Sequence, residues 1–238
     1  MIKLYFCTSP NVYKVAIALE EMGLNYQLIA VDLSKGHHRD AAKVAGAKTG
    51  KLPVISDENP ADGGDPITVF ESGAILQYLA EKTGEFLSNN LRQRTLTMQW
   101  LFWQMGALGP IGGQAGHFLL YAPQVDPTID YTYPANRYFN MWTLLWRILE
   151  GQLAIHEYIA GDYSIADMAC FPWISHLPPR ESAQPFPNIC RWREAVAARP
   201  AVQAAYQKGA QLDTGYGRNE KGVTMFPWEG ILKNVITV

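Results

Sequence analysis

The chain has 238 residues, of which 48% are hydrophobic and 18% charged, and its formal net charge is −2. This composition excludes a disordered chain, and the near-neutral charge without a basic tract argues against a nucleic-acid partner or an anionic lipid surface. The length suffices for two modest domains, each with its own core.

The first third of the chain alternates between strand and helix patterns. Short apolar and β-branched runs predict strands at residues 2–6, 26–31, 53–55 and 67–70. Apolar residues at helical spacing predict one helix from Pro10 to a cap at Gly23, and a second helix that Ser72 caps and that ends near Gly84. The order is a parallel βαβ unit, an irregular link, then a hairpin and a helix, which makes an α/β layer of about 80 residues.

After Gly84 the strand signals nearly vanish and helical patterns follow. Helices are predicted at about 90–118, at about 135–153, from Ser164 onward and at about 187–197. Ser164 and Asp167 have the spacing of a capping box. We therefore predict an α/β domain over residues 1–83 and an all-α domain over 91–238, with an irregular tail from about 211 that includes Trp228.

The cysteines and the first residues of the chain indicate the cellular compartment of the protein. Cys7, Cys170 and Cys190 are too few for a disulfide framework, so a reducing cytoplasm is expected. No apolar run approaches the roughly 18 residues of a membrane span, and the start lacks the pattern of a signal peptide. The pair His37-His38 has no second cluster of ligands beside it, so no metal site is predicted.

The segment from Cys7 to Asn11 joins the first strand to the first helix. Backbone N–H groups and the helix dipole favour an anion at such a helix start. A hydroxyl from Ser9 or an amide from Asn11 can donate to a bound thiolate and lower the pKa of the thiol. The alternative is that both residues simply cap the helix.

Two further segments carry candidate binding groups. Pro53 opens a strand, and a cis Leu52–Pro53 bond would turn the backbone of Leu52 toward an extended ligand, although a trans bond is the commoner state. At the start of the following helix, Ser72 can receive a carboxylate and Glu71 can pair with an ammonium. The alternative is an ordinary cap preceded by a surface acid.

Several motifs then match one family pattern. They are Ser9 to Val15, Lys51-Leu52-Pro53, Asp62-Gly63-Gly64, Phe70 to Leu76, Gln99 to Gln104, Tyr163 to Asp167 and Arg199-Pro200-Ala201. In these motifs the chain resembles the glutathione transferases, over roughly residues 1–205. Within that family it is similar to the bacterial Nu class, a branch that also resembles a yeast nitrogen-regulating prion protein. The resemblance implies a thioredoxin-like N-terminal domain followed by an all-α domain.

The resemblance also implies roles for individual residues. Leu52 would precede a cis-proline, Pro53, and pair with the cysteinyl backbone of glutathione, while Glu71 and Ser72 would hold the γ-glutamyl end. Ser9 and Asn11 would activate the sulfur, and His38 would reach the glycyl end. The remaining role falls to Arg137, which would reach across a homodimer to a second glutathione.

The leading hypothesis is a glutathione-dependent disulfide reductase in which two glutathiones, or one glutathione disulfide, occupy the site and no protein cysteine takes part. One alternative is attack of glutathione on an electrophilic carbon, including cleavage of aryl ethers, with Trp103, Gly106 and Phe118 as walls of the acceptor pocket. Another is a non-catalytic glutathione-binding protein that regulates a partner.

Overall fold

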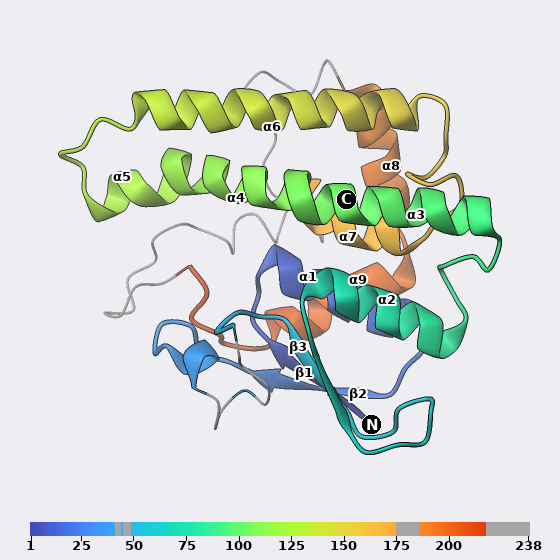
Figure 1. The fold of residues 1–238 in the computed structure, drawn as a ribbon. Coiled ribbons are helices and arrows are strands. Elements are labelled where there is room, and N and C mark those ends of the chain that lie inside the picture. Colours follow the sequence, from blue (N-terminus) through green and yellow to red (C-terminus); the bar gives the residue numbers. More distant parts are fainter. Residues whose placement is uncertain (41–43, 45–48, 175–185, 218–238) are drawn as a thin grey trace.

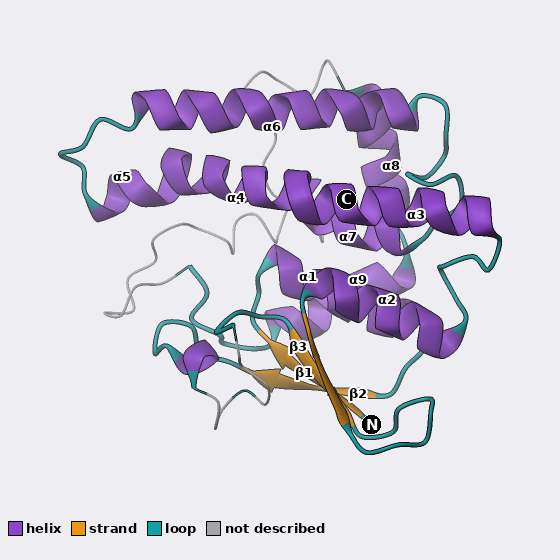
Figure 2. Ribbon diagram, in the orientation of Figure 1, coloured by secondary structure: helices purple, strands orange, loops and turns teal. Residues whose placement is uncertain are grey.

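The computed structural model describes residues 1–40, 44, 49–174 and 186–217, which form a small sheet beneath a group of long helices (Figure 1). The strands are β1 (Ile2–Phe6), β2 (Tyr26–Ala30), β3 (Val54–Asp57) and β4 (Ile67–Phe70), in the order β2-β1-β3-β4. β1 and β2 are parallel, whereas β3 is antiparallel to both β1 and β4 (Figure 2). This is the predicted βαβ unit with a terminal hairpin, so the α/β fold class of this part is confirmed.

Two helices cover the sheet on the side of the long helices (Figure 1). They are α1 (Pro10–Glu21) and α2 (Ser72–Thr83). Pro10 fits the first turn of α1 because its missing N–H would have no partner there. α2 ends before Gly84, as predicted, and Gly84 adopts the left-handed conformation common after a helix. The prediction that Ser72 caps α2 is wrong, because Glu71 is the residue before the helix and no side chain caps its N-terminus.

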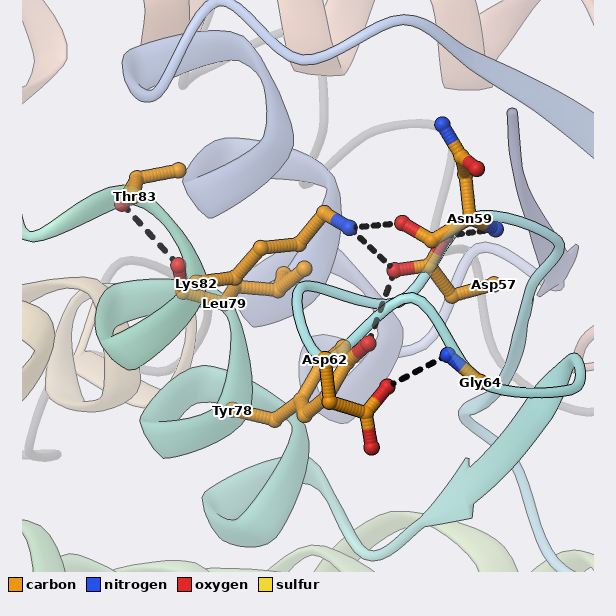
Figure 3. A network of polar contacts seen from close by, with 8 residues as sticks. All are labelled: Asp57, Asn59, Asp62, Gly64, Tyr78, Leu79, Lys82 and Thr83. Carbon is orange, nitrogen blue, oxygen red and sulfur yellow. Dashed lines mark hydrogen bonds and ion pairs between the residues drawn. The ribbon is translucent and has the colours of Figure 1, made fainter.

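Buried Asp57, at the end of β3, ties the sheet to α2 (Figure 3). Its Oδ2 accepts a hydrogen bond of 2.8 Å from the hydroxyl of Tyr78 and lies 2.8 Å from the ammonium of Lys82, while its Oδ1 accepts from the backbone N–H of Asn59. Burial opposes the charged form of this carboxyl, but the bonds from Lys82, Asn59 and Tyr78 prevail and hold its pKa below the usual value. The network fixes α2, and with it the start of that helix at Ser72, against the sheet.

The rest of the described chain is helical. It comprises α3 (Leu91–Trp103), a π-helical turn η2 (Gln104–Leu108), α4 (Gly109–Gly116), a second π turn η3 (His117–Tyr121), α5 (Ala122–Val125), α6 (Thr132–Leu153), α7 (Ile165–Ile174), α8 (Pro187–Ala197) and α9 (Pro200–Ala210). The helix predicted at about 90–118 therefore continues to Val125 through two π turns. It lies alongside α6 (Figure 1). The predicted all-helical character of this half is confirmed.

α9 was not among the predicted helices, and it packs against α1. The rings of Tyr13 and Tyr206 stack with their centroids 4.1 Å apart. A Cβ at Gly209 would lie 2.6 Å from the hydroxyl of Tyr13 and 2.6 Å from the ring of Phe6. The backbone of α9 thus approaches the first domain as closely as a glycine permits, and one apolar core runs through both halves of the chain.

The predicted capping box at the start of α7 is confirmed. The hydroxyl of Ser164 accepts from the backbone N–H of Ala166, and Asp167 accepts from the backbone N–H of Ser164 at 3.0 Å. Among the described helices, none is both long and apolar enough to cross a membrane. Of the predicted irregular tail, residues 211–217 are described and contain no helix or strand, whereas the part with Trp228 lies outside the described residues. The limits of the two domains stay predictions.

Candidate functional site

A cavity of about 760 Å³ lies where the sheet layer meets the long helices. Its lining comes from both halves of the chain: Asn11 and Lys14 of α1, the segment from Lys51 to Pro53, Glu71 and Ser72 before and in α2, Gln104 and Met105 of η2, part of α4, Tyr138 of α6 and Trp173 of α7. The cavity therefore gathers five of the predicted site residues, namely Asn11, Leu52, Pro53, Glu71 and Ser72.

The bond between Leu52 and Pro53 is cis, as the family resemblance implies. Pro53 directly precedes β3, and the register pairs Val54 with Phe70. That pairing brings the end of β4, and Glu71 after it, next to the cis-proline. The backbone of Leu52 and the start of α2 thus belong to the same wall of the cavity.

Glu71 adopts a left-handed backbone conformation, with φ of 71°, which is uncommon for a residue other than glycine. Its carbonyl still accepts the first hydrogen bond of the helix, from the N–H of Ile75 at 2.9 Å. Its side chain is exposed, whereas Ser72 beside it is buried. An acid at the cavity rim and a hydroxyl at the helix start suit a ligand that carries an ammonium next to a carboxylate.

Asn11, in the first turn of α1, is held by an indole from the other half of the chain. The Nε1–H of Trp173 donates to its Oδ1 at 2.9 Å. Because that oxygen is engaged, the NH2 group of Asn11 is the part of the amide available to a ligand. The motif analysis missed Trp173, which lies 162 residues away in the sequence.

Lys14, one turn further along α1, is a second residue that the sequence analysis did not select. It is 1% exposed, and its Nζ donates to Oε1 of Gln104 at 2.6 Å and to the hydroxyl of Ser72 at 3.4 Å. Burial lowers its pKa from 10.5 to about 7, against smaller opposing effects of Cys170 and Glu71. The pocket therefore contains a buried amine that titrates near neutral pH.

Ser9 precedes α1, and its carbonyl accepts from the N–H groups of Val12 and Tyr13 at 3.1 Å. Its side chain makes no capping bond and lies outside the cavity lining. Cys7 is buried, and burial raises the pKa of its thiol to about 11 against the hydrogen bonds from Ser9. A thiol of that kind stays protonated at neutral pH, which agrees with the hypothesis that no protein cysteine takes part in the reaction.

The remaining predicted residues lie outside the lining of this cavity. His38 is half-buried in a 3-10 turn, η1 (His37–Arg39), and Arg137 is exposed on α6. Trp103 packs edge-to-face against Trp100. Phe118 stacks on Tyr138, a lining residue, with ring centroids 5.6 Å apart. Gly106 is exposed, and a Cβ added to it would have nothing within 4 Å.

Within the described residues, no three histidine, cysteine or acidic side chains are arranged to hold a metal ion. The polar groups that line the cavity are amides, hydroxyls, ammonium groups and a carboxylate.

Two family profiles match the chain. The profile of the glutathione S-transferase N-terminal domain matches residues 4–86, and that of the C-terminal domain matches residues 144–200. Two relatives come from Escherichia coli strain K12. The disulfide-bond oxidoreductase YfcG is 45% identical over 214 residues, which cover 89% of this chain and 97% of the relative. The disulfide-bond oxidoreductase YghU is 38% identical over 219 residues, which cover 85% and 73%.

A solved structure gives the same result at the level of the fold. The glutathione transferase from Pseudomonas putida, crystallised with one glutathione disulfide bound per subunit, aligns with a TM-score of 0.79 and 38% identity. The alignment covers 86% of this chain and 90% of that one.

Proposed function

This chain belongs to the glutathione S-transferase family, and we propose that it is a glutathione-dependent disulfide-bond reductase. One observation carries the proposal: Asn11, the cis Leu52–Pro53 segment, Glu71 and Ser72 line a single cavity. The names of the E. coli relatives and the glutathione disulfide in the P. putida structure support the same activity. Membership of the Nu class stays a prediction.

The reaction needs two glutathiones and no cysteine of the chain. One glutathione thiolate attacks a sulfur of the substrate disulfide, forms a mixed disulfide and releases the other substrate sulfur as a thiolate. A second glutathione thiolate attacks the glutathione sulfur of the mixed disulfide, which gives glutathione disulfide and the second substrate thiolate. The two glutathiones thus supply both electrons. No cysteine is among the cavity-lining residues, and Cys7 and Cys170 are buried.

The protein's part is to bind glutathione and to favour its thiolate. We assign the sulfur to the NH2 group of Asn11, the glutamyl end to Glu71 and Ser72, and the cysteinyl backbone to Leu52. The hydroxyl of Ser9, which lies outside the cavity lining, stays a predicted second donor to the sulfur. Each donor bond to a buried thiolate contributes about 1–3 kcal/mol. The roles of His38, Trp103 and Phe118 stay predictions.

The test is glutathione-dependent reduction of 2-hydroxyethyl disulfide, coupled to glutathione reductase. We expect rapid turnover by the unaltered protein and a loss of roughly one to two decades of rate in Asn11→Ala. Ser9→Ala should lower the rate in the same direction. The matched control is Asn25→Ala, at an exposed asparagine before β2, which should keep the full rate.

Other outcomes separate the alternatives. Full activity in Asn11→Ala would remove that residue from the mechanism. Binding of glutathione without disulfide reduction, followed by turnover of an electrophilic carbon substrate, would make the protein a conjugating or ether-cleaving enzyme. Binding without turnover of either substrate class would favour a regulatory protein.

We also propose a homodimer located in the cytoplasm. Arg137 shares one face of α6 with Met141, Leu144 and Ile148, since the spacing of these residues follows the helical repeat. Leu144 is 57% exposed and Ile148 43%. An exposed apolar stripe of this kind is typical of a protein interface. Light scattering should give twice the mass of 26.6 kDa, and Leu144→Glu should shift the protein toward monomer.

A further inference from the structure

The ammonium of Lys14 is buried and forms no ion pair with a described residue. Its polar contacts are Oε1 of Gln104, the hydroxyl of Ser72 and, at 3.8 Å, the sulfur of Met105. The ring of Trp173 lies 6.0 Å from it.

A buried ammonium in such surroundings is costly, because neutral dipoles replace only part of its hydration. The lowered pKa of Lys14 expresses that cost. Beside it, the Nε2 group of Gln104 is buried and has no acceptor among the described residues. The Oε1 of that amide faces the ammonium at 2.6 Å, so Nε2 is necessarily the group left over. One buried donor at this corner of the cavity, Nε2 of Gln104, thus lacks an acceptor, and it lies beside an ammonium whose hydrogen-bond acceptors are all neutral.

Lys14 shares this corner with the start of α2. Its Nζ lies 3.4 Å from the hydroxyl of Ser72, the first residue of that helix. The first N–H groups of a helix of twelve residues add donors and a partial positive charge at the same place. A carboxylate received by Ser72 would therefore lie next to the ammonium as well.

We propose that Lys14 is an anion-binding residue of the glutathione pocket, which supplies the counter-charge for the α-carboxylate of the γ-glutamyl group at Ser72. This inference rests on the proposed function and adds a specificity determinant to it. The thiolate is the competing anion, but the donor assigned to it is Asn11, which Trp173 holds in place.

If Lys14 binds the carboxylate, the affinity for glutathione depends on the pH. The titratable groups around Lys14 are few: Glu71, exposed before α2, and Cys170, buried in α7, while η2 presents only Gln104 and Met105. Burial raises the pKa of the Cys170 thiol, so it stays neutral. As the pH rises through about 7, the amine of the free protein loses its proton, and affinity for the carboxylate falls.

The first measurement is calorimetric binding of S-methylglutathione, whose blocked sulfur does not ionise, to the full chain. Lys14→Met should weaken binding roughly tenfold to a hundredfold at pH 6.5, the range expected for one charge-assisted hydrogen bond. The affinity of the unaltered protein should fall between pH 6.5 and 8.5, and that of Lys14→Met should stay level. Lys35→Met, at an exposed lysine, is the matched control. Thermal unfolding of the free variants checks that each is folded.

The second measurement deletes the proposed partner on the ligand. S-methylated 4-aminobutyryl-cysteinylglycine lacks only the glutamyl α-carboxylate and retains the amine and the glycyl carboxylate. With this ligand, Lys14→Met should bind as well as the unaltered protein. An equal loss with both ligands, or no loss with S-methylglutathione, would overturn the inference and leave the proposed function standing. Failure of the unaltered protein to bind S-methylglutathione and glutathione would overturn both.

Discussion

The indole N–H of Trp173 donates a hydrogen bond of 2.9 Å to Oδ1 of Asn11, across the boundary between the α/β layer and the helices. An indole nitrogen is a donor only, so the amide oxygen has to face it and the NH2 group has to face away. The orientation of the group proposed to act on the sulfur is therefore set by a residue in α7.

Trp173→Phe keeps an aromatic ring and removes the donor. We expect kcat/KM for disulfide reduction to fall roughly threefold to tenfold, the equivalent of one neutral hydrogen bond. The pKa of bound glutathione, measured by its thiolate absorbance, should rise because the amide is no longer held. Trp100→Phe, outside the cavity lining, should change neither quantity. An unchanged thiol pKa in Trp173→Phe would show that the indole does not position Asn11.

The indole of Trp173 packs against glycines of α4. A Cβ at Gly112 would lie 3.2 Å from the ring of Trp173 and 2.9 Å from Nε1 of Trp142. Both rings are large and held by their neighbours, so Gly112→Ala should lower the free energy of unfolding by about 1–3 kcal/mol. It should also lower disulfide-reductase activity. Urea unfolding gives the first quantity.

Gly151→Ala is the matched control for that substitution. Gly151 lies in α6 with nothing within 4 Å of its added Cβ. Alanine there should raise stability by roughly 0.5–1 kcal/mol, since glycine is a poor helix former. Equal changes in the free energy of unfolding for the two substitutions would show that the rings of Trp173 and Trp142 do not require a glycine at position 112.

The sheet and its two helices could be predicted because their signals are local. Alternation predicted β1 over its observed bounds, and helical spacing predicted α1. β3 begins one residue later than predicted, at Val54, because Pro53 has no N–H to donate to the sheet. Ser72 is a typical capping residue, yet its hydroxyl accepts a hydrogen bond from Lys14 of α1, and no local pattern contains that partner.

α9 was missed because its buried face is built from mostly small residues. Val202, Ala205, Tyr206 and Gly209 follow helical spacing, but alanine and glycine give a weak apolar signal. This face of α9 packs closely against Tyr13 of α1, and that contact depends on tertiary packing that the sequence pattern does not contain. Small residues at helical spacing close to the rings of another helix would have been the signal to search for.

The residues of the candidate site likewise fall into those with a local sequence signal and those without one. Asn11 and the Glu71-Ser72 pair were predicted because each belongs to a short motif at a helix start. Lys14 was not, because a lysine within an amphipathic helix is usually exposed, and here α2, η2 and α7 bury it. Gln104 lies within a motif that indicates the family, but its role follows only from its contact with Lys14.

Lys14 should also impose a pH dependence on the stability of the ligand-free protein. Its pKa is about 7 when folded and 10.5 in the reference state, so between these values the unfolded chain binds more protons. Stability contributed by this group therefore rises with pH, by at most about 1.4 kcal/mol per unit. Lys14→Met should be more stable than the unaltered protein at pH 6.5, and the difference should shrink toward pH 9. If the free energies of unfolding of the two proteins, measured with urea, changed with pH in parallel, a buried charge at Lys14 would be contradicted.

The carboxylate of Asp167 accepts four hydrogen bonds. Its Oδ1 accepts from the N–H of Ile159 at 3.0 Å and the indole of Trp192 at 2.8 Å. Its Oδ2 accepts from the N–H and the hydroxyl of Ser164, at 3.0 and 3.3 Å. Burial raises its pKa to about 6, against these bonds, so at pH 7.5 the group is ionised and all four bonds are charge-assisted.

In Asp167→Asn, an amide NH2 turned toward Ser164 can donate to its hydroxyl but leaves the N–H of Ser164 without an acceptor. The opposite orientation leaves the N–H of Ile159 and the indole of Trp192 without acceptors, and in both orientations the remaining bonds are no longer charge-assisted. We expect the free energy of unfolding at pH 7.5 to fall by roughly 3–6 kcal/mol. The control is Asp162→Asn, an exposed aspartate in the preceding loop, which should stay within about 0.5 kcal/mol. Urea unfolding at 15 °C measures both. A loss below about 1 kcal/mol in Asp167→Asn would show that the start of α7 does not depend on the ionised carboxylate, because an asparagine would then satisfy the same donors.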